Sequence, residues 1–208
     1  MQLRAARTRQ ILVKAAADEF DRNGYRGASL ARVSRAAGVS IGALTFHFPN
    51  KAELAVAVRE QGEAATASAV AAVTALREGP LQTVVTLTLA LTRLLEKDVA
   101  VRATARLARE QSGAPGWFTA WVPVIHQQLR RAHESKAGSV ADRRAVADLA
   151  THLVTGAEIT IRHRARRDSL TEGQSVAELA RIWAAVGGFT AARGDIDVKG
   201  RGGDRPCR

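Results

Sequence analysis

The sequence predicts an all-α protein, with a small N-terminal domain of three helices followed by a larger C-terminal helical domain. Along most of the 208 residues, apolar side chains recur at intervals of three and four, which is the spacing of one face of an α-helix. Strand signals are nearly absent, because aromatic residues make up only 4% of the chain and no alternating apolar and polar run lies between turn residues. With 46% hydrophobic and 25% charged residues, the composition is that of a globular protein that buries a core.

The first helix is expected from about Arg4 to Asn23. Gly24 follows it and can adopt the left-handed conformation that ends many helices. The apolar residues at helical spacing, which should form the buried stripe, are Ile11, Leu12, Ala15, Ala16 and Phe20.

Two short helices are expected next, separated by a tight turn at Gly38. Ser29 is a favourable N-cap for the first of them, which should end at Ala37, and Ser40 for the second, which should end near Phe48. Proline 49 stops the second helix, because the residue before a proline is pushed out of the helical region. The residues of the first short helix expected to point inward are Leu30, Val33 and Ala36.

The remaining predicted helices belong to the larger domain. Asn50 and Glu53 form a signature similar to a capping box, so a long helix should start there and reach about Arg77. Residues 81–97 are apolar on most sides, which predicts a helix inside the core. Further helices are expected over residues 99–111, 117–136 (bent at Pro123), 139–167 and 175–192.

The charge of the chain is strongly positive and unevenly distributed. Lys and Arg number 31 against 20 Asp and Glu, a formal net charge of +11 at pH 7. Residues 1–51 hold 9 of the basic and only 3 of the acidic side chains. A basic segment of domain size indicates a polyanion partner such as nucleic acid. A composition biased toward Arg, with its charges solvated, remains the alternative.

A cytoplasmic protein is expected. No run of about 18 uncharged apolar residues is present, which excludes a spanning helix. The N-terminus lacks the apolar segment of a secretory signal. The single cysteine, Cys207, cannot form an internal disulfide, and this fits a reducing compartment.

Residues 29–48, SLARVSRAAGVSIGALTFHF, predict a helix-turn-helix. Small side chains at the turn let the two helices approach closely. Leu44 and Phe48 lie four residues apart and should share the inner face of the second helix with Val39. Ile41 and Thr45, also four apart, then share a different face, which in a recognition helix meets the major groove. On spacing alone, a basic helical bundle without a DNA-binding role stays open.

The arginines that precede and occupy this motif, and the lysine that follows it, suit contacts to phosphates, which position a protein on DNA. His47 either contacts a phosphate or is merely exposed at a helix end. The complete set of residues expected to bind DNA is Arg4, Arg7, Arg9, Ser29, Arg32, Ser40, Ile41, Gly42, Ala43, Thr45, His47 and Lys51.

The longer string AADEFDRNGYRGASLARVSRAAGVSIGALTFHFPNKAEL resembles the DNA-binding region of the TetR family of bacterial transcriptional repressors. The Phe-x-x-x-Gly-Tyr ending of the first helix, the Ala-Gly-Val-Ser turn and the His-Phe-Pro-Asn-Lys exit carry this resemblance. Two further strings, Gly42–Phe48 and Trp117–Trp121, are similar to the γ-butyrolactone autoregulator receptors of actinobacteria. The sequence departs from many relatives at Thr45, where they have tyrosine, and at Ile41, where they have lysine or another polar residue, so an altered sequence preference is expected.

The resemblance implies a homodimer that binds a palindromic operator on double-stranded DNA, and a small-molecule effector. Residues 1–49 would be the helix-turn-helix DNA-binding domain and residues 50–193 the ligand-binding and dimerisation domain. Residues 194–208, rich in glycine and charge, would be a flexible tail.

The resemblance also places Trp121 in the ligand pocket, with its ring against the ligand. Other candidate ligand contacts lie mostly on apolar faces of helices that should surround the cavity, and ordinary core packing is the alternative for each. They are Phe118, Leu87, Leu91, Val154, Thr155 and Trp183, together with the amide of Gln61.

The last two predicted helices are expected to form half of a four-helix dimer interface. The candidate interface residues are Leu153, Ile161, Leu179, Ile182, Val186 and Phe189. The basic run over residues 162–167 is expected to be a solvated helix C-terminus, where cations suit the helix dipole, and a second DNA-binding patch is the alternative.

These observations favour a regulator over an enzyme. The sequence lacks His-Glu-x-x-His, a Gly-rich phosphate loop, a nucleophile elbow and Cys-x-x-Cys, and its five histidines show no metal-binding spacing. No cofactor, metal or membrane partner is expected. The predicted protein is a repressor released from DNA by a γ-butyrolactone or butenolide-like signal that displaces the long helix beginning at Asn50, and it would control secondary metabolism. The alternative is a pseudo-receptor that responds to an antibiotic-like molecule or to no ligand.

Overall fold

The computed structural model describes residues 2–111, 116–134 and 140–187, and within these ranges every regular element is a helix. The predicted all-α fold is therefore confirmed. The elements are α1 (Gln2–Gly27), α2 (Leu30–Ala37), α3 (Ile41–His47), α4 (Lys51–Ala75), α5 (Pro80–Lys97), α6 (Val99–Glu110), a 3₁₀ turn η1 (Trp117–Ala120), α7 (Val122–Glu134), α8 (Val140–Arg166) and α9 (Gln174–Gly187).

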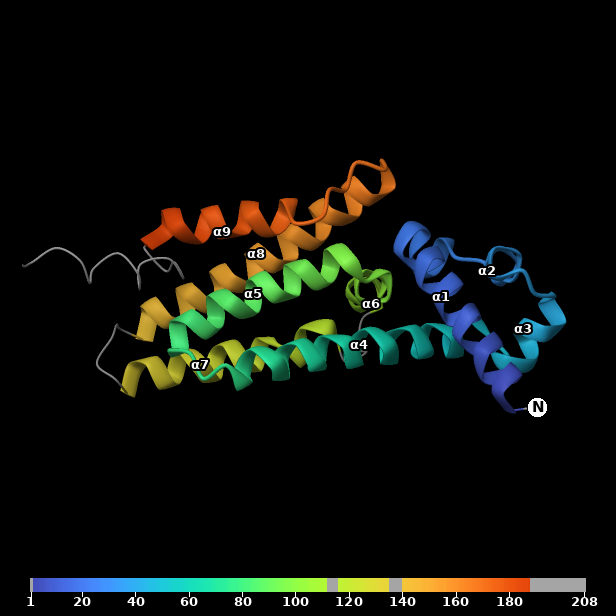
Figure 1. Ribbon diagram of the computed structural model, residues 1–208, viewed down its shortest axis with the longest axis horizontal. Coiled ribbons are helices and arrows are strands. Elements are labelled where there is room, and N and C mark those ends of the chain that lie inside the picture. The colour runs from blue at the N-terminus through green and yellow to red at the C-terminus, as the bar shows by residue number, and fades with distance from the viewer. Residues whose placement is uncertain (1, 112–115, 135–139, 188–208) are drawn as a thin grey trace, which may run out of the picture.

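The first three helices form one end of the molecule, and α5, α7, α8 and α9 form a bundle at the other (Figure 1). Helix α4 extends from the small end along the bundle. Helix α6 is seen almost end-on in Figure 1, between the two ends, and packs against both α1 and α4. Among the described residues, no helix is both long enough and apolar enough to cross a membrane.

Side-chain caps begin the short helices and α4, as the sequence predicts. The Ser29 hydroxyl accepts a hydrogen bond from the Arg32 amide at 3.4 Å, and the Ser40 hydroxyl accepts one from the Ala43 amide at 3.1 Å. The Asn50 side chain accepts from the Glu53 amide at 2.9 Å and donates to the Glu53 carboxylate at 3.0 Å. These caps satisfy amides that have no partner inside the helix.

Helix α1 differs from its prediction at two points. Gly24 has a positive φ of 69° as expected, but its ψ is −179°, and helical residues continue beyond it to Gly27. Ile11 is 42% exposed rather than buried. The buried stripe is centred on Leu12, Ala16 and Phe20, and Ile11 lies about 100° around the helix from Leu12, at the edge of this stripe.

Two other expected positions are also wrong. Ala36 of α2 is exposed, because Val33 and Ser34 carry the buried face of this short helix. The bend expected at Pro123 lies before it, at Trp121, which separates the 3₁₀ turn from α7. Pro123 therefore occupies the first turn of α7, where a missing amide hydrogen costs nothing.

The molecule has two hydrophobic cores, and α6 contributes to both. Ala100, Ala103 and Leu107 belong to the core that holds α1, α2 and α3 together with the first part of α4. Val101 and Ala105, on another face of α6, belong to the core of the helical bundle. Helix α6 is thus packed between the small end and the bundle.

Candidate functional site

Helix α3 combines a buried anchor with an exposed outer face. Leu44 is fully buried and Phe48, which ends the helix, is 3% exposed. On the outer face, Ile41 is 51% exposed and Phe46 is 82% exposed. Thr45 is exposed as well, and its hydroxyl donates to the Gly42 carbonyl at 3.1 Å. The structure therefore places the expected recognition residues on one accessible surface.

Phe46 is the residue of this surface that the sequence reasoning missed. It lies two positions from each of the anchors Leu44 and Phe48, so it points to the opposite side of the helix. Its ring contacts the half-buried His47 edge to face, with 5.4 Å between ring centroids. The spacing of the aromatic residues in the string Gly42–Phe48 was the available signal.

Three basic residues near the start of α1 are exposed, and one of them contacts Phe48 at the end of α3. Arg4 and Arg7 are exposed, and the Arg4 carbonyl accepts a hydrogen bond from Thr8. The exposed Arg9 lies with its guanidinium carbon 5.1 Å from the centre of the Phe48 ring. This cation–π contact fixes Arg9 next to the C-terminus of α3.

Arg32 has partners within the subunit. Its guanidinium forms an ion pair with Glu19 of α1 at 2.6 Å and also donates to the Gly27 carbonyl. Glu19 additionally accepts the Ser29 amide at 3.3 Å. Arg32 therefore links α2 to α1, while its side chain stays 47% exposed and its contact with phosphate stays a prediction.

Lys51 is also engaged within the subunit. Its ammonium group donates to the Ala28 carbonyl at 3.1 Å and lies 4.7 Å from the centre of the Tyr25 ring. The side chain is half-buried between α1 and the start of α4. These contacts fix α4 to the loop before α2, and the contact of Lys51 with phosphate stays a prediction.

Most of the expected ligand contacts meet in one place. Leu87, Leu91, Val154, Trp121 and Trp183 are at most 1% exposed and share the core of the bundle. Phe118 is half-buried, and its ring centroid lies 5.7 Å from that of Trp121.

The two polar candidates are placed differently. The half-buried Thr155 donates its hydroxyl to the Thr151 carbonyl of its own helix at 2.8 Å. Gln61 is wrong as a pocket residue, because it is exposed on the outer side of α4. The neighbouring Gly62 faces inward instead, against Thr104 and Ala100 of α6.

The indole groups of the three tryptophans have different hydrogen-bond partners. Trp117 donates to the Thr66 hydroxyl and Trp183 to the Thr88 hydroxyl, each at 2.9 Å. The indole nitrogen of Trp121 is buried and has no partner in the part of the chain that the structure describes. A buried donor without an acceptor costs free energy, about 1–3 kcal/mol, which an acceptor on a ligand would recover.

A set of ion pairs joins the small end to the bundle. Arg102 of α6 pairs with the buried Asp21 of α1 at 2.8 Å. Arg106 pairs with Glu110 at 2.6 Å, and Glu110 also accepts the Tyr25 amide at 2.7 Å. Burial alone would raise the pKa of Glu110, but these hydrogen bonds from Arg106 and Tyr25 bring it below its usual range.

Most of the basic run at the end of α8 is paired. Arg162 contacts Glu158 at 2.6 Å, Arg164 contacts Glu178 at 2.9 Å, and Arg166 donates to the Arg22 carbonyl. Burial raises the pKa of Glu158 in spite of its arginine partners. The run is therefore neither a fully solvated helix end nor a free second patch for DNA.

The expected dimer residues divide into two groups. Ile182 and Val186 of α9 are 41% and 51% exposed, as an unpaired interface requires, and Leu153 is half-buried. Ile161 and Leu179 are wrong as interface residues, because the subunit's own core buries them. Phe189 lies outside the described residues. Within the described residues, no three His, Cys, Asp or Glu side chains could together hold a metal ion.

Comparison with known proteins agrees with this geometry. Residues 12–58 match the model of the bacterial regulatory proteins, tetR family. A 60-residue segment is 42% identical to the A-factor receptor protein of Streptomyces griseus, and this match covers 29% of this chain and 22% of that protein.

Solved structures extend the similarity to most of the chain. A γ-butyrolactone receptor described as ArpA-like has a TM-score of 0.70 and 28% identity, over 88% of this chain and 87% of that one. CprB from Streptomyces coelicolor, in complex with its biological operator sequence, has a TM-score of 0.63 and 27% identity, over 88% of each chain. Residues 12–58 thus match the tetR family of bacterial regulatory proteins, and the chain is similar over most of its length to the γ-butyrolactone receptors.

Proposed function

We propose that the protein is a transcriptional repressor that binds a palindromic operator as a homodimer and releases it when a small signalling molecule binds. In this proposal residues 1–49 contact DNA, residues 50–193 bind the ligand and dimerise, and residues 194–208 are a flexible tail. The protein acts in the cytoplasm, where it reaches the chromosome. The observation that supports the proposal is the exposed outer face of α3. The helix itself is held in place, because Ser40 caps it and the buried Leu44 anchors it.

The outer face of α3 is mainly apolar, so it would recognise bases in the major groove mainly through apolar contacts. Ile41 and Phe46 offer no hydrogen bonds, so they would contact the C5-methyl groups of thymine. Thr45 adds one hydroxyl and a methyl group. Arg4, Arg7 and Arg9 lie at the same end of the subunit, together with the exposed Ser40, Gly42 and the partly exposed Ala43, and would contact the backbone of the DNA.

We place the effector at Trp121. A γ-butyrolactone or a butenolide combines an apolar chain with a carbonyl oxygen, and that oxygen is the acceptor that the indole nitrogen lacks. The buried side chains Leu87, Leu91 and Val154 would contact the apolar chain of the ligand. A ligand of this class would connect the protein to the control of secondary metabolism.

Helix α6 is the element through which the ligand would act. The core that contains Trp121 includes Val101 and Ala105 of α6, and the core of the DNA-binding end includes Ala103 and Leu107. A ligand that displaces Trp121 therefore moves α6 against α1, in addition to any movement of α4. Weakening DNA binding 100-fold requires about 2.8 kcal/mol of coupling, which allosteric proteins supply, and the DNA must weaken ligand binding equally.

The test is a gel-shift titration on a palindromic operator that the protein selects from random DNA. γ-Butyrolactones, butenolides and furans are added separately to the complex. Release by one of these classes at micromolar concentration supports the proposal. A stable complex in the presence of all of them supports the pseudo-receptor alternative, and failure to select any DNA contradicts both.

A further inference from the structure

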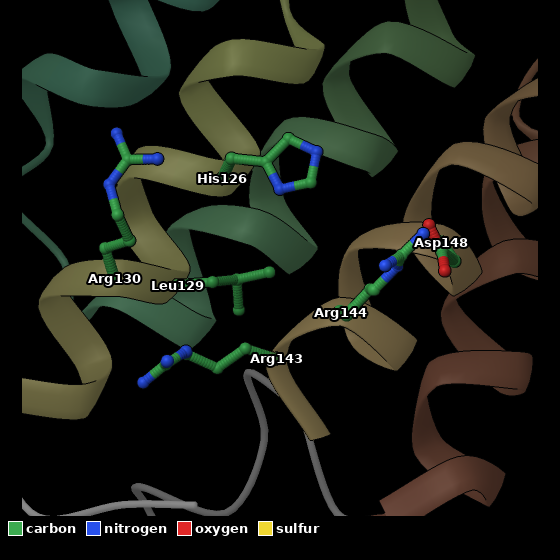
Figure 2. Close-up of a pocket in the computed structure, with 6 residues that line it drawn as sticks. All are labelled: His126, Leu129, Arg130, Arg143, Arg144 and Asp148. Atoms are coloured by element: carbon green, nitrogen blue, oxygen red, sulfur yellow. The ribbon is translucent and has the colours of Figure 1, made fainter. Parts of the chain in front are cut away.

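A hollow lies between α7 and α8 and is lined by side chains of both helices (Figure 2). Its volume is about 410 Å³, within the range of small-molecule sites. Helix α7 contributes His126, Leu129 and Arg130, and helix α8 contributes the remaining side chains. The six lining residues are His126, Leu129, Arg130, Arg143, Arg144 and Asp148.

The described side chains around this hollow carry an unbalanced positive charge. Among them, three guanidinium groups and an imidazole lie near one carboxylate, that of Asp148. None of the three arginines forms an ion pair with the described residues. By contrast, the arginines between the DNA-binding end and the bundle, such as Arg102 and Arg162, are paired with carboxylates.

Arg143 supplies the second observation. Its Nη1 atom is buried from solvent and has no hydrogen-bond partner among the described residues. A buried donor on a charged group normally finds an acceptor, because leaving it unpaired costs more than leaving a neutral group unpaired. The acceptor that is missing among the described residues is one that a bound anion would provide.

The position of the arginines on α8 adds to the unbalanced charge. The helix begins at Val140, so Arg143 and Arg144 lie in its first turns. The N-terminal end of a helix carries a partial positive charge, and cations there are disfavoured while anions are favoured. Arg144 and Asp148 are four residues apart on one face, so the carboxylate offsets only one of the cations.

We propose that the hollow between α7 and α8 binds a small anion that carries a phosphate group or paired carboxylates. Guanidinium groups recognise these two groups through parallel hydrogen bonds, which chloride cannot form. The site is separate from the one proposed at Trp121. Leu129, which is 2% exposed, forms its floor and belongs to the same core as Trp121. The inference goes beyond the proposed function and does not depend on it.

Isothermal titration of the full-length protein with pyrophosphate and with citrate tests the site, at an ionic strength held constant with sodium chloride. We expect saturable binding of at least one probe. Arg144→Gln and Arg143→Gln should each weaken it at least tenfold, while Arg131→Gln, an exposed arginine on α7 that does not line the hollow, should change it less than twofold. Circular dichroism verifies that the variants are folded.

A variant that binds the probe more tightly provides a further control, because a misfolded variant would not gain affinity. Asp148→Asn removes the only carboxylate among the described residues that line the hollow and should tighten binding of the same probe severalfold. Equal losses in Arg131→Gln and Arg144→Gln would show nonspecific attraction to a basic protein and would overturn the proposal. Absence of saturable binding to either probe would also overturn it.

Discussion

At the scale of single residues, Trp121 is a buried side chain whose hydrogen-bond donor has no acceptor among the described residues. Its ring is fully buried and packs against Trp117, with 5.5 Å between ring centroids. Core packing alone accounts for the ring but not for an indole nitrogen without an acceptor. Phenylalanine would fill much of the same space without this cost, so a tryptophan here indicates a donor that is used in another state of the protein.

Replacement of Trp121 by phenylalanine should therefore separate ligand binding from DNA binding. One neutral hydrogen bond contributes about 0.5–1.5 kcal/mol, so the ligand Kd should rise by about two- to tenfold. The operator Kd should stay unchanged. The measurements are calorimetric titration with the ligand that releases the operator, and fluorescence anisotropy with labelled DNA. Trp117→Phe is the control, since its N–H is already bonded to Thr66. An unchanged ligand Kd in Trp121→Phe would contradict the assignment.

Phe46 is the most exposed large apolar side chain of α3, so it would bury the most apolar surface on contact with DNA. Burying a phenylalanine contributes about 1.5–3 kcal/mol, so Phe46→Ala should weaken operator binding about tenfold or more. The free energy of unfolding should hardly change, because the side chain is 82% exposed. The buried Leu44 is the contrasting position, where alanine should cost about 2–5 kcal/mol of stability. Urea titration and anisotropy distinguish the two effects; full operator affinity in Phe46→Ala would exclude the contact.

Lys51 and Arg7 should respond differently to salt. Arg7→Ala should lower the slope of log K against log salt concentration by about 1 for the phosphate contact it removes. Lys51→Ala should change this slope much less but should lower the free energy of unfolding, because its ammonium bonds to Ala28 and packs on Tyr25. Operator titrations at several salt concentrations give the slopes. Equal reductions of the slope in both variants would show that Lys51 contacts phosphate as Arg7 does.

The difference between Lys51 and Arg7 shows where prediction from sequence ends at this scale. Helical spacing correctly assigned the inner and outer faces of α3, because Leu44 and Phe48 are buried while Ile41 and Thr45 are exposed. Spacing could not show that Ala28 captures a lysine 23 positions away. Such contacts depend on how α1 crosses α4, and the pattern of a single helix contains no information about that crossing.

At the scale of helices, Gly62 sets how closely α4 approaches α6. A Cβ atom built at this position would lie 2.2 Å from the Thr104 hydroxyl and 2.7 Å from the Ala100 carbonyl. The backbone of Ala100 cannot turn away as a flexible side chain could. The two helices therefore pack at a distance that only glycine permits, and this contact joins α4 to the helix shared by both cores.

Gly62→Ala should destabilise the protein, although alanine is the better helix former. Overpacking of this kind costs about 1–3 kcal/mol, against a gain of about 0.5–1 kcal/mol from helix propensity. Gly42→Ala, where the nearest atom is 4.0 Å from the added Cβ, is the matched control and should leave the stability unchanged or slightly higher. Unfolding in urea without DNA measures both. A stabilised Gly62→Ala variant would show that the packing of α4 on α6 tolerates a wider separation.

The individual helices were predictable because their ends depend on local chemistry. Ser29, Ser40 and Asn50 cap the helices that follow them, and each bond joins residues three apart in sequence. The role of α6 was not predictable in the same way. Its two buried faces, typified by Leu107 and Val101, lie about 120° apart around the helix, and only the tertiary structure shows that they belong to different cores.

At the scale of the whole molecule, the exposed apolar surface of the bundle is consistent with an interface to a second copy of the chain. In the proposed repressor, the DNA-binding end would need a second copy to read a palindrome, with recognition helices about 34–36 Å apart. In the bundle, Ile182 and Val186 of α9 and Ile159 of α8 have large apolar side chains that are 41–51% exposed. Related by a twofold axis, these residues would bury one another and would fix the separation of the two α3 helices.

Ile182→Glu should therefore convert a dimer into monomers and abolish tight operator binding, although the substitution is far from α3. A carboxylate facing its own symmetry mate in an apolar interface carries both a desolvation cost and a charge repulsion. Leu76→Glu is the control, because Leu76 is 58% exposed at the end of α4 and outside this face. Sedimentation velocity and anisotropy on the same samples give mass and affinity together. A dimeric Ile182→Glu variant, or a monomer that keeps wild-type operator affinity, would place the interface elsewhere, because a single α3 can contact only half of a palindrome.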